Sequence, residues 1–385
     1  MTTAPDLIGE RSASFVELFF DLVFVFGVTQ VVVSIHGHLD WPTMWRAAVV
    51  LGLLWWAWSQ FTWAAGAADF DELIPRVVLL AATAGIFVTA VSVNGAWGDD
   101  GATFGLGYFG VMALAGVFVW LRARGTETMA GMIAYMPRVL AGASLVAVGG
   151  FLEGDLRSAL WIGGIVLNLL GAAQGGRYEW AIDSDHFTER HGLFVIIVLG
   201  EALIAIGVGT VGHPGTLAFF AAGTAALTLA LAMWWAYFDW PYVVGRRVMK
   251  DMSGLERTRF ARDGYTLAHY PLIAGVVVFA VGAEEILAHP DAVASAPHRW
   301  ALAGGLAVYL LSMVIWMWRA TTKLAWERLV LVAGLVGVAG TLGGLSGAWF
   351  AALVATMTVI ALGVESARHL DALRELRARD SGSSG

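Results

Sequence analysis

Long apolar stretches, separated by short polar segments, run along almost the whole chain. A helix needs about 20 mostly apolar residues to cross hydrocarbon about 30 Å thick, because each residue adds about 1.5 Å. These stretches do not alternate apolar and polar residues as the strands of a membrane barrel must. The pattern therefore predicts an all-α, polytopic integral membrane protein with about twelve transmembrane helices. The predicted spans are 14–36, 44–66, 76–97, 102–122, 128–152, 157–175, 192–212, 215–240, 264–287, 299–319, 325–345 and 347–369.

The amino-acid composition agrees with this interpretation. Hydrophobic residues make up 58% of the 385 positions and charged residues 14%, against roughly 45–50% and 25% in soluble domains. The chain has no cysteine, which excludes disulfides, thiolate metal sites and cysteine nucleophiles. We expect no metal site, no cofactor and no nucleic acid partner. Membrane lipids and a small solute or cation are the expected partners, and the sequence is compatible with a homo-oligomer.

The basic residues predict the orientation of the chain. All but four of the 23 Lys and Arg residues fall on one side of the predicted spans, and an excess of this kind marks the cytoplasmic side. Arg46, Arg157 and Arg299 fall opposite, and Arg138 lies inside the fifth span. We therefore expect a multi-pass protein of the cell membrane with its N-terminus and C-terminus both cytoplasmic.

Two pairs of matching segments suggest an internal duplication. Phe15-Val16 and Phe194-Val195 are separated by the same number of positions as Trp55-Trp56-Ala57 and Trp234-Trp235-Ala236. Six spans per half would give two parallel six-helix repeats related by an axis near the membrane normal. The expected organisation is a first half (1–175), a cytoplasmic connector (176–191), a second half (192–372) and a flexible C-terminal tail (373–385).

A few ionisable residues fall inside the predicted spans. A charge at the bilayer centre costs at least about 2.5–3.5 kcal/mol, so such residues are candidates for a site. Glu17 and Asp21 lie four positions apart and share one face of the first helix. Glu201 lies near the middle of the seventh span, Arg138 in the fifth and His269 in the ninth. We expect these five residues to form an ion-binding or solute-binding site, with Arg138 as partner of a carboxylate.

The balance of charge in this candidate site favours a proton or a cation as its ligand. Three carboxylates face a single arginine, and close carboxylates cannot all be ionised in a low dielectric, so at least one should carry a proton. The alternative is structural, because a polar network can also serve only to hold helices together.

Two longer motifs resemble one known family. Arg11 to Gln30, RSASFVELFFDLVFVFGVTQ, resembles the opening signature of the low temperature requirement protein A family, and His186 to Ile204, HFTERHGLFVIIVLGEALI, resembles its central motif. The segment Ala268 to Gly275 resembles a third motif. The resemblance implies a bacterial multi-pass membrane protein linked by name to growth in the cold, without a settled activity. The family-motif residues are Arg11, Phe15, Phe20, His186, Glu189 and Arg190.

The start of the chain is also similar, in part, to a lysosomal and bacterial potassium channel family with two six-helix repeats. That family has Phe-Ser-Asp in its signature, where this chain has Phe19-Phe20-Asp21 and, in the second half, Leu199-Gly200-Glu201. No filter residue is carried over, because the serine is missing.

Three functions are compatible with these observations. The first is a transporter or channel for a small solute, above all a proton or cation, through an acidic site between the two halves. The second is a membrane-embedded enzyme on a lipid-like substrate, although no phosphate loop, nucleophile elbow or metal motif supports it. The third is a structural or regulatory membrane protein. The sequence favours the first and argues against an enzyme.

Overall fold

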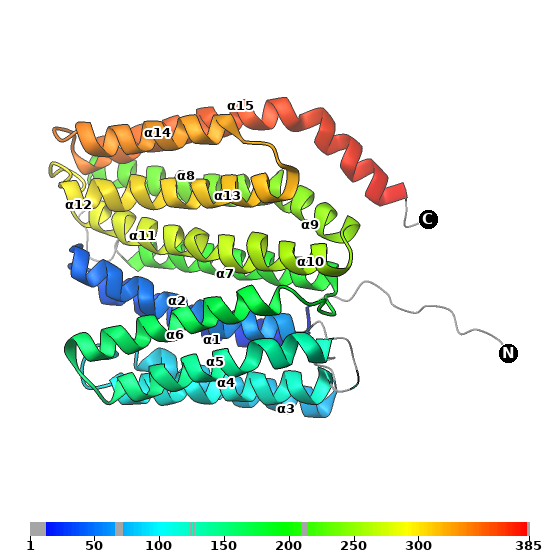
Figure 1. Cartoon of the computed structure of the whole chain (residues 1–385). Coiled ribbons are helices and arrows are strands. Elements are labelled where there is room, and N and C mark those ends of the chain that lie inside the picture. The colour runs from blue at the N-terminus through cyan, green and yellow to red at the C-terminus, as the bar shows by residue number, and fades with distance from the viewer. Residues whose placement is uncertain (1–12, 66–71, 124, 126–127, 209–214, 383–385) are drawn as a thin grey trace. The chain divides into compact units, whose positions relative to one another are not determined.

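The computed structural model describes residues 13–65, 72–123, 125, 128–208 and 215–382 (Figure 1). Apart from one isolated bridge between Val293 and Ser346, the regular structure of these residues is helical, which confirms the all-α prediction. The helices are α1 (Phe15–Ile35), α2 (Trp41–Ala65), α3 (Leu73–Val91), α4 (Gly101–Ala123), α5 (Thr128–Gly150), α6 (Gly154–Gly175), α7 (Ser184–Val208), α8 (Leu217–Phe238), α9 (Pro241–Asp251), α10 (Gly254–Phe260), the π-helix η1 (Ala261–Leu267), α11 (Ala268–Ala288), α12 (Ala296–Arg299), the π-helix η2 (Trp300–Gly304), α13 (Gly305–Thr321), α14 (Trp326–Thr341) and α15 (Gly347–Gly382).

Ten helices in the described part of the chain are long and apolar enough to cross a membrane. The two other predicted spans coincide with α2 and α14. The helix α14 has 16 residues, fewer than the roughly 20 of a full crossing. The helix α2 has 25 residues, but its tryptophans, Arg46 and Gln60 make it less apolar. The chain is thus a multi-pass helical membrane protein.

The helices belong to two compact units. The first unit contains α1 up to Ser34, most of α2, α3 to α6, the first half of α7, and α10 with part of η1. The second unit contains the end of α7, then α8, most of α9, the end of η1, and α11 to α15. The units consist of Met1–Ser34, Trp45–Ile197 and Val248–Tyr265, and of Ile35–Met44, Val198–Arg247 and Thr266–Gly385.

In the first unit, α3, α4, α5 and α6 lie side by side in chain order (Figure 1). Glycines allow α5 and α6 to approach closely. A Cβ atom added at Gly142 would lie 2.7 Å from the carbonyl oxygen of Gly164, which is closer than non-bonded atoms tolerate. Small residues at helix contacts are typical of membrane bundles, where close backbone packing replaces the hydrophobic effect.

In the second unit, α11 packs closely on α13, and α8 packs on α15. Gly275 of α11 faces Gly305 of α13, whose carbonyl oxygen would lie 2.7 Å from a Cβ atom at position 275.

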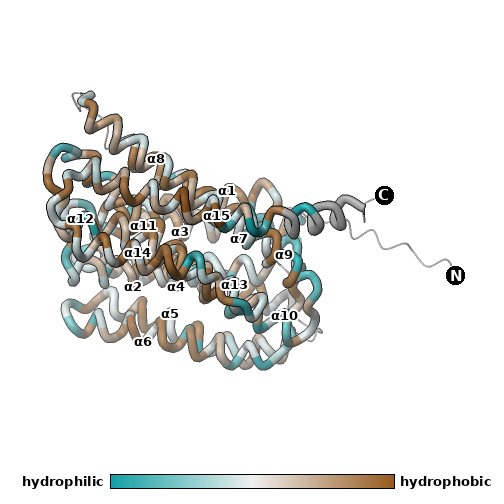
Figure 2. The backbone as a smooth tube through the Cα atoms, turned by 90° about the horizontal axis from the view of Figure 1, so that it is seen from above, coloured by the Kyte–Doolittle hydropathy of each residue, from teal (hydrophilic) through white to brown (hydrophobic). Residues whose placement is uncertain are grey.

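Hydrophobic residues cover most of the long helices, whereas hydrophilic stretches occur around the short helices α9 and α10 (Figure 2). The polar loop helices are therefore distinct from the apolar spans.

The π-helix η1 continues directly from α10 into α11, so that residues 254–288 form one unbroken helical run. The chain passes from the first unit to the second between Tyr265 and Thr266, inside η1. A π-helical turn contains more residues than an α-helical turn and shifts the faces of the helix that follows.

Candidate functional site

The two acidic residues of α1 lie close to its N-terminal end. Glu17 accepts hydrogen bonds from the backbone N–H and the hydroxyl of Ser14, both at 2.9 Å. A Ser followed three positions later by Glu is a capping box, which satisfies backbone groups at a helix start. Asp21 lies one turn further into the helix on the same face. The sequence thus fixes where α1 begins and brings both carboxylates to one side.

Arg190 of α7 binds both carboxylates. Its Nη1 donates to Oε1 of Glu17 and its Nη2 donates to Oδ1 of Asp21, each at 2.6 Å. Asp21 and Arg190 are 0% exposed and Glu17 is 2% exposed. Charge-assisted bonds of this length are among the strongest in proteins, and breaking a buried pair costs about 3–5 kcal/mol. The arginine therefore ties α7 to α1.

Two more side chains complete the cluster. Nε2 of His186, one turn before Arg190 on α7, lies 3.1 Å from both carboxylate oxygens of Glu17. The indole N–H of Trp58 on α2 donates to Oδ1 of Asp21 at 2.7 Å. The Trp58 ring also faces the guanidinium of Arg190, whose Cζ lies 5.8 Å from the ring centroid, within cation–π range. We call Glu17, Asp21, Trp58, His186 and Arg190 the buried ion cluster.

Aromatic rings surround this cluster and exclude water from it. Phe20, on α1 between the two carboxylates, is buried and contacts the rings of Phe24 and Phe61. On α7, His191 packs edge-on against Trp58, with ring centroids 5.0 Å apart. Because water is excluded, the local dielectric is low. A low dielectric strengthens each hydrogen bond in the cluster and raises the free-energy cost of any uncompensated charge.

The structure brings together some of the predicted site residues and not others. Glu17 and Asp21 share a face as expected, but their arginine is Arg190 and not Arg138. Arg138 is half-buried on α5 and donates to the backbone oxygen of Ala134 in its own helix. The sequence analysis missed Arg190 because α7 begins at Ser184, well before the expected residue 192. His186 and Arg190 consequently lie inside a helix and not in a connector.

The two remaining candidates, Glu201 and His269, belong to the second unit. Glu201 is half-buried on α7 and makes no hydrogen bond or ion pair with a described residue. His269 is buried on α11, where its Nε2 lies 2.9 Å from the hydroxyl of Tyr237 and its ring contacts that of Trp316. Glu201 and His269 therefore have different surroundings, and neither Tyr237 nor Trp316 belongs to the buried ion cluster.

The family-motif residues have different roles. His186 and Arg190 belong to the buried ion cluster, and Phe20 packs beside it. Glu189 accepts a hydrogen bond from the backbone N–H of Ala13 at 3.2 Å. Phe15 is 92% exposed at the start of α1, and Arg11 lies outside the described residues.

The second unit has a buried ion pair of its own. Arg328 of α14 binds Glu365 of α15, its Nε lying 2.9 and 3.0 Å from the two carboxylate oxygens. Arg328 also donates to the backbone oxygen of Ala236 at 2.8 Å. One acid thus balances one base, with no excess charge within this pair.

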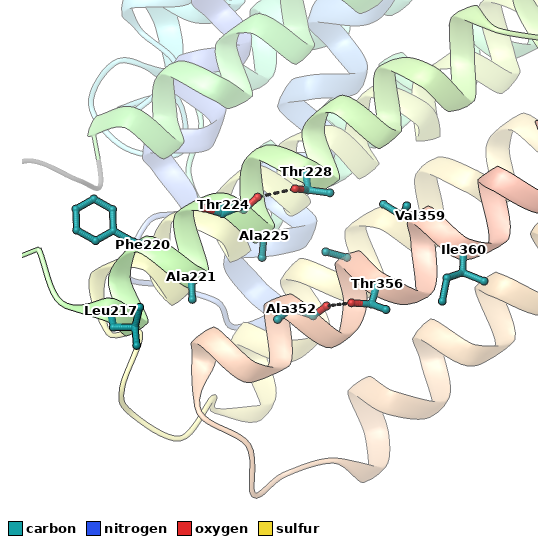
Figure 3. A pocket seen from close by; sticks show the side chains of 11 residues that line it. Leu217, Phe220, Ala221, Thr224, Ala225, Thr228, Ala352, Thr356, Val359 and Ile360 are labelled. Atoms are coloured by element: carbon teal, nitrogen blue, oxygen red, sulfur yellow. Dashed lines mark hydrogen bonds between the residues drawn. The ribbon is translucent and has the colours of Figure 1, made fainter.

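An apolar groove of about 590 Å³ lies between α8 and α15 of the second unit (Figure 3). The hydroxyls of Thr228 and Thr356 donate to the backbone oxygens of Thr224 and Ala352, four positions earlier in each helix. None of the lining residues is charged, so the groove provides no counterpart to the buried ion cluster. The lining residues are Leu217, Phe220, Ala221, Thr224, Ala225, Thr228, Ala352, Ala355, Thr356, Val359 and Ile360.

The fold and the buried ion cluster together describe a polytopic helical membrane protein that buries two carboxylates against one arginine and one histidine. The family described as bacterial low temperature requirement A protein (LtrA) matches residues 12–364, and the chain therefore belongs to this family. The family predicted from the sequence motifs is confirmed, and the matched residues include every member of the buried ion cluster.

A relative supports this assignment. The chain is 30% identical over 335 residues to the uncharacterized protein RA0937 of Rhizobium meliloti (strain 1021), a match that covers 82% of this chain and 79% of the relative. No solved structure matches the chain significantly.

Proposed function

We propose that this protein is a transporter or channel for a small solute, with a proton or cation as the ion that it moves, and that the buried ion cluster binds this ion. One observation carries the proposal: two carboxylates with almost no exposure share a single arginine. Ionisable groups are expensive inside a membrane, and they mark ion pathways and proton relays more often than other sites.

The composition of the cluster separates it from an ordinary ion pair. A pair such as Arg328–Glu365 is neutral and needs no further ion, whereas Glu17 and Asp21 together exceed the charge of Arg190 by one. The cluster can become neutral by taking up a positive ion. Binding and release of such an ion is the elementary step of transport.

Glu201 and His269 stay candidates for further positions along the ion path. Arg138 is also kept as a candidate, although Arg190 occupies the place that was expected for it. The proposal includes a chain of twelve spans in two parallel halves in the cell membrane, with both termini cytoplasmic, in contact with membrane lipids.

A structural role is the second candidate, and one observation favours it. Arg190 joins α1 to α7 through both its terminal nitrogens, as polar side chains do when they only hold membrane helices together. For the third reading, a membrane-embedded enzyme, the described residues provide no supporting observation.

The deciding experiment is flux of protons, Na⁺ and K⁺ into liposomes that contain the purified protein. We expect flux in the native chain and its loss in Glu17→Gln and Asp21→Asn. The matched control is Glu327→Gln, because Glu327 belongs to the second unit and binds Arg368, whose side chain is largely exposed. Folded variants that keep full flux would contradict the proposal, and no flux of any ion in the native chain would favour the structural role.

A further inference from the structure

We infer that the ion taken by the buried ion cluster is a proton, and that Oδ2 of Asp21 is the atom that carries it. The inference rests on the proposed function for the identity of the site, but it concerns only what the site binds. The contacts of the four carboxylate oxygens, the place of Arg190 and the charge count support it.

Three of the four carboxylate oxygens already accept hydrogen bonds. Oε1 of Glu17 accepts from Arg190, Oε2 of Glu17 from Ser14, and Oδ1 of Asp21 from both Trp58 and Arg190. Oδ2 of Asp21 is buried and has no hydrogen-bond partner among the described residues. Buried polar atoms are almost always paired, so this oxygen is the open acceptor of the cluster, while Nε of Arg190 is a buried donor that also lacks a partner among the described residues.

A metal cation does not fit this arrangement. Such ions need several oxygen ligands that converge on one point, six or more for calcium and magnesium. Here the guanidinium of Arg190 occupies the space where the two carboxylates converge, at 2.6 Å from each. Its positive charge repels a second cation at this short range. A proton needs only one free lone pair, and Oδ2 offers one.

The two carboxylates exceed the one guanidinium by one negative charge, which a single proton on Asp21 would neutralise. The charged groups that face Asp21 are Glu17 from its own helix and Arg190 from α7, while α2 contributes the uncharged Trp58. When an O–H bond forms at Oδ2, Glu17 and Arg190 remain as a neutral pair. Release of that proton returns one negative charge to a dry environment, which is unfavourable unless another proton arrives.

Infrared difference spectroscopy of the whole chain in lipid, between low and high pH, tests the inference. We expect the C=O stretching band of one protonated carboxylic acid, which shifts in heavy water and disappears in Asp21→Asn. Glu327→Gln should keep the band. If Asp21→Asn does not fold, Asp21→Glu serves instead and should shift the band without removing it.

Two outcomes would overturn the inference: a band that persists unchanged in the folded Asp21 variants, or one that Na⁺ or K⁺ removes at constant pH. The flux assay separates this failure from that of the proposed function. A band assigned to Asp21 without any flux would leave proton binding intact and refute transport. Asp21-dependent flux of Na⁺ or K⁺ without a band would support transport and refute the proton.

Discussion

Oδ1 of Asp21 accepts a hydrogen bond from Nη2 of Arg190 at 2.6 Å, although 169 positions separate the two residues in the chain. The other terminal nitrogen of the same arginine holds Glu17. One residue therefore governs both the packing of α7 on α1 and the charge of the candidate site. Stability and ion binding need to be measured separately in every variant of the cluster.

Arg190→Met should be strongly destabilising, by about 3–5 kcal/mol, because it leaves two buried carboxylates without their partner. The triple variant Glu17→Gln, Asp21→Asn, Arg190→Met should recover most of this loss, because no charge is then left unpaired. Unfolding in mixed micelles measures both effects. The triple variant should nevertheless move no ions, and a triple variant with normal flux would refute a role of the cluster in transport.

Trp58→Phe removes one indole N–H from Asp21 and keeps an aromatic ring, so we expect a loss of about 0.5–1.5 kcal/mol, as for a hydrogen bond to the neutral, protonated carboxyl group. It should also change the pH at which the Asp21 infrared band appears. Trp161→Phe is the matched control, since Trp161 is equally buried and donates to the backbone oxygen of Val146. If both variants shift the band alike, the contact with Trp58 has no specific effect.

The two ion pairs of α14 and α15 should differ in strength. Glu365→Ala leaves the buried Arg328 unpaired and should cost about 3–5 kcal/mol. Glu327→Ala breaks a contact with Arg368, whose side chain is largely exposed, and should cost at most about 1 kcal/mol. Thermal unfolding of the two variants in the same detergent makes the comparison, and equal losses would contradict the buried position of Arg328.

Arg138→Gln should leave both the infrared band and the free energy of unfolding nearly unchanged, within about 1 kcal/mol, as for most partly exposed positions. The reason is that Arg138 donates to a backbone oxygen in its own helix. Arg190→Gln is the matched variant and should abolish the normal pH dependence of the band. A loss of the band in Arg138→Gln would instead show that Arg138 acts on Asp21.

The sequence predicted those features that depend on local pattern. Apolar length predicted the helices, and the four-residue spacing of Glu17 and Asp21 predicted that both lie on one face of the first helix. These inferences need only the geometry of a single helix, which is the same in every protein.

The partner itself could not be predicted in this way. Arg190 lies near the polar end of a span, where an arginine is ordinarily counted as a signal of orientation. Its burial depends on α7 beginning at Ser184 and on which helix packs against it, and neither is encoded locally. The motif that contains His186 and Arg190, four positions apart, was the signal available, since that spacing puts both on one helix face.

The shift of helical phase at η1 has a consequence for the residues on either side of it. Tyr265 packs against His191 in the first unit, whereas His269, four positions later, pairs with Tyr237 in the second. In an uninterrupted α-helix, residues with this spacing would stack on one side. One helical run thus supplies an aromatic contact to each unit, so that deleting a single residue from 261–267 would rotate His269 away from Tyr237 while sparing the residues upstream.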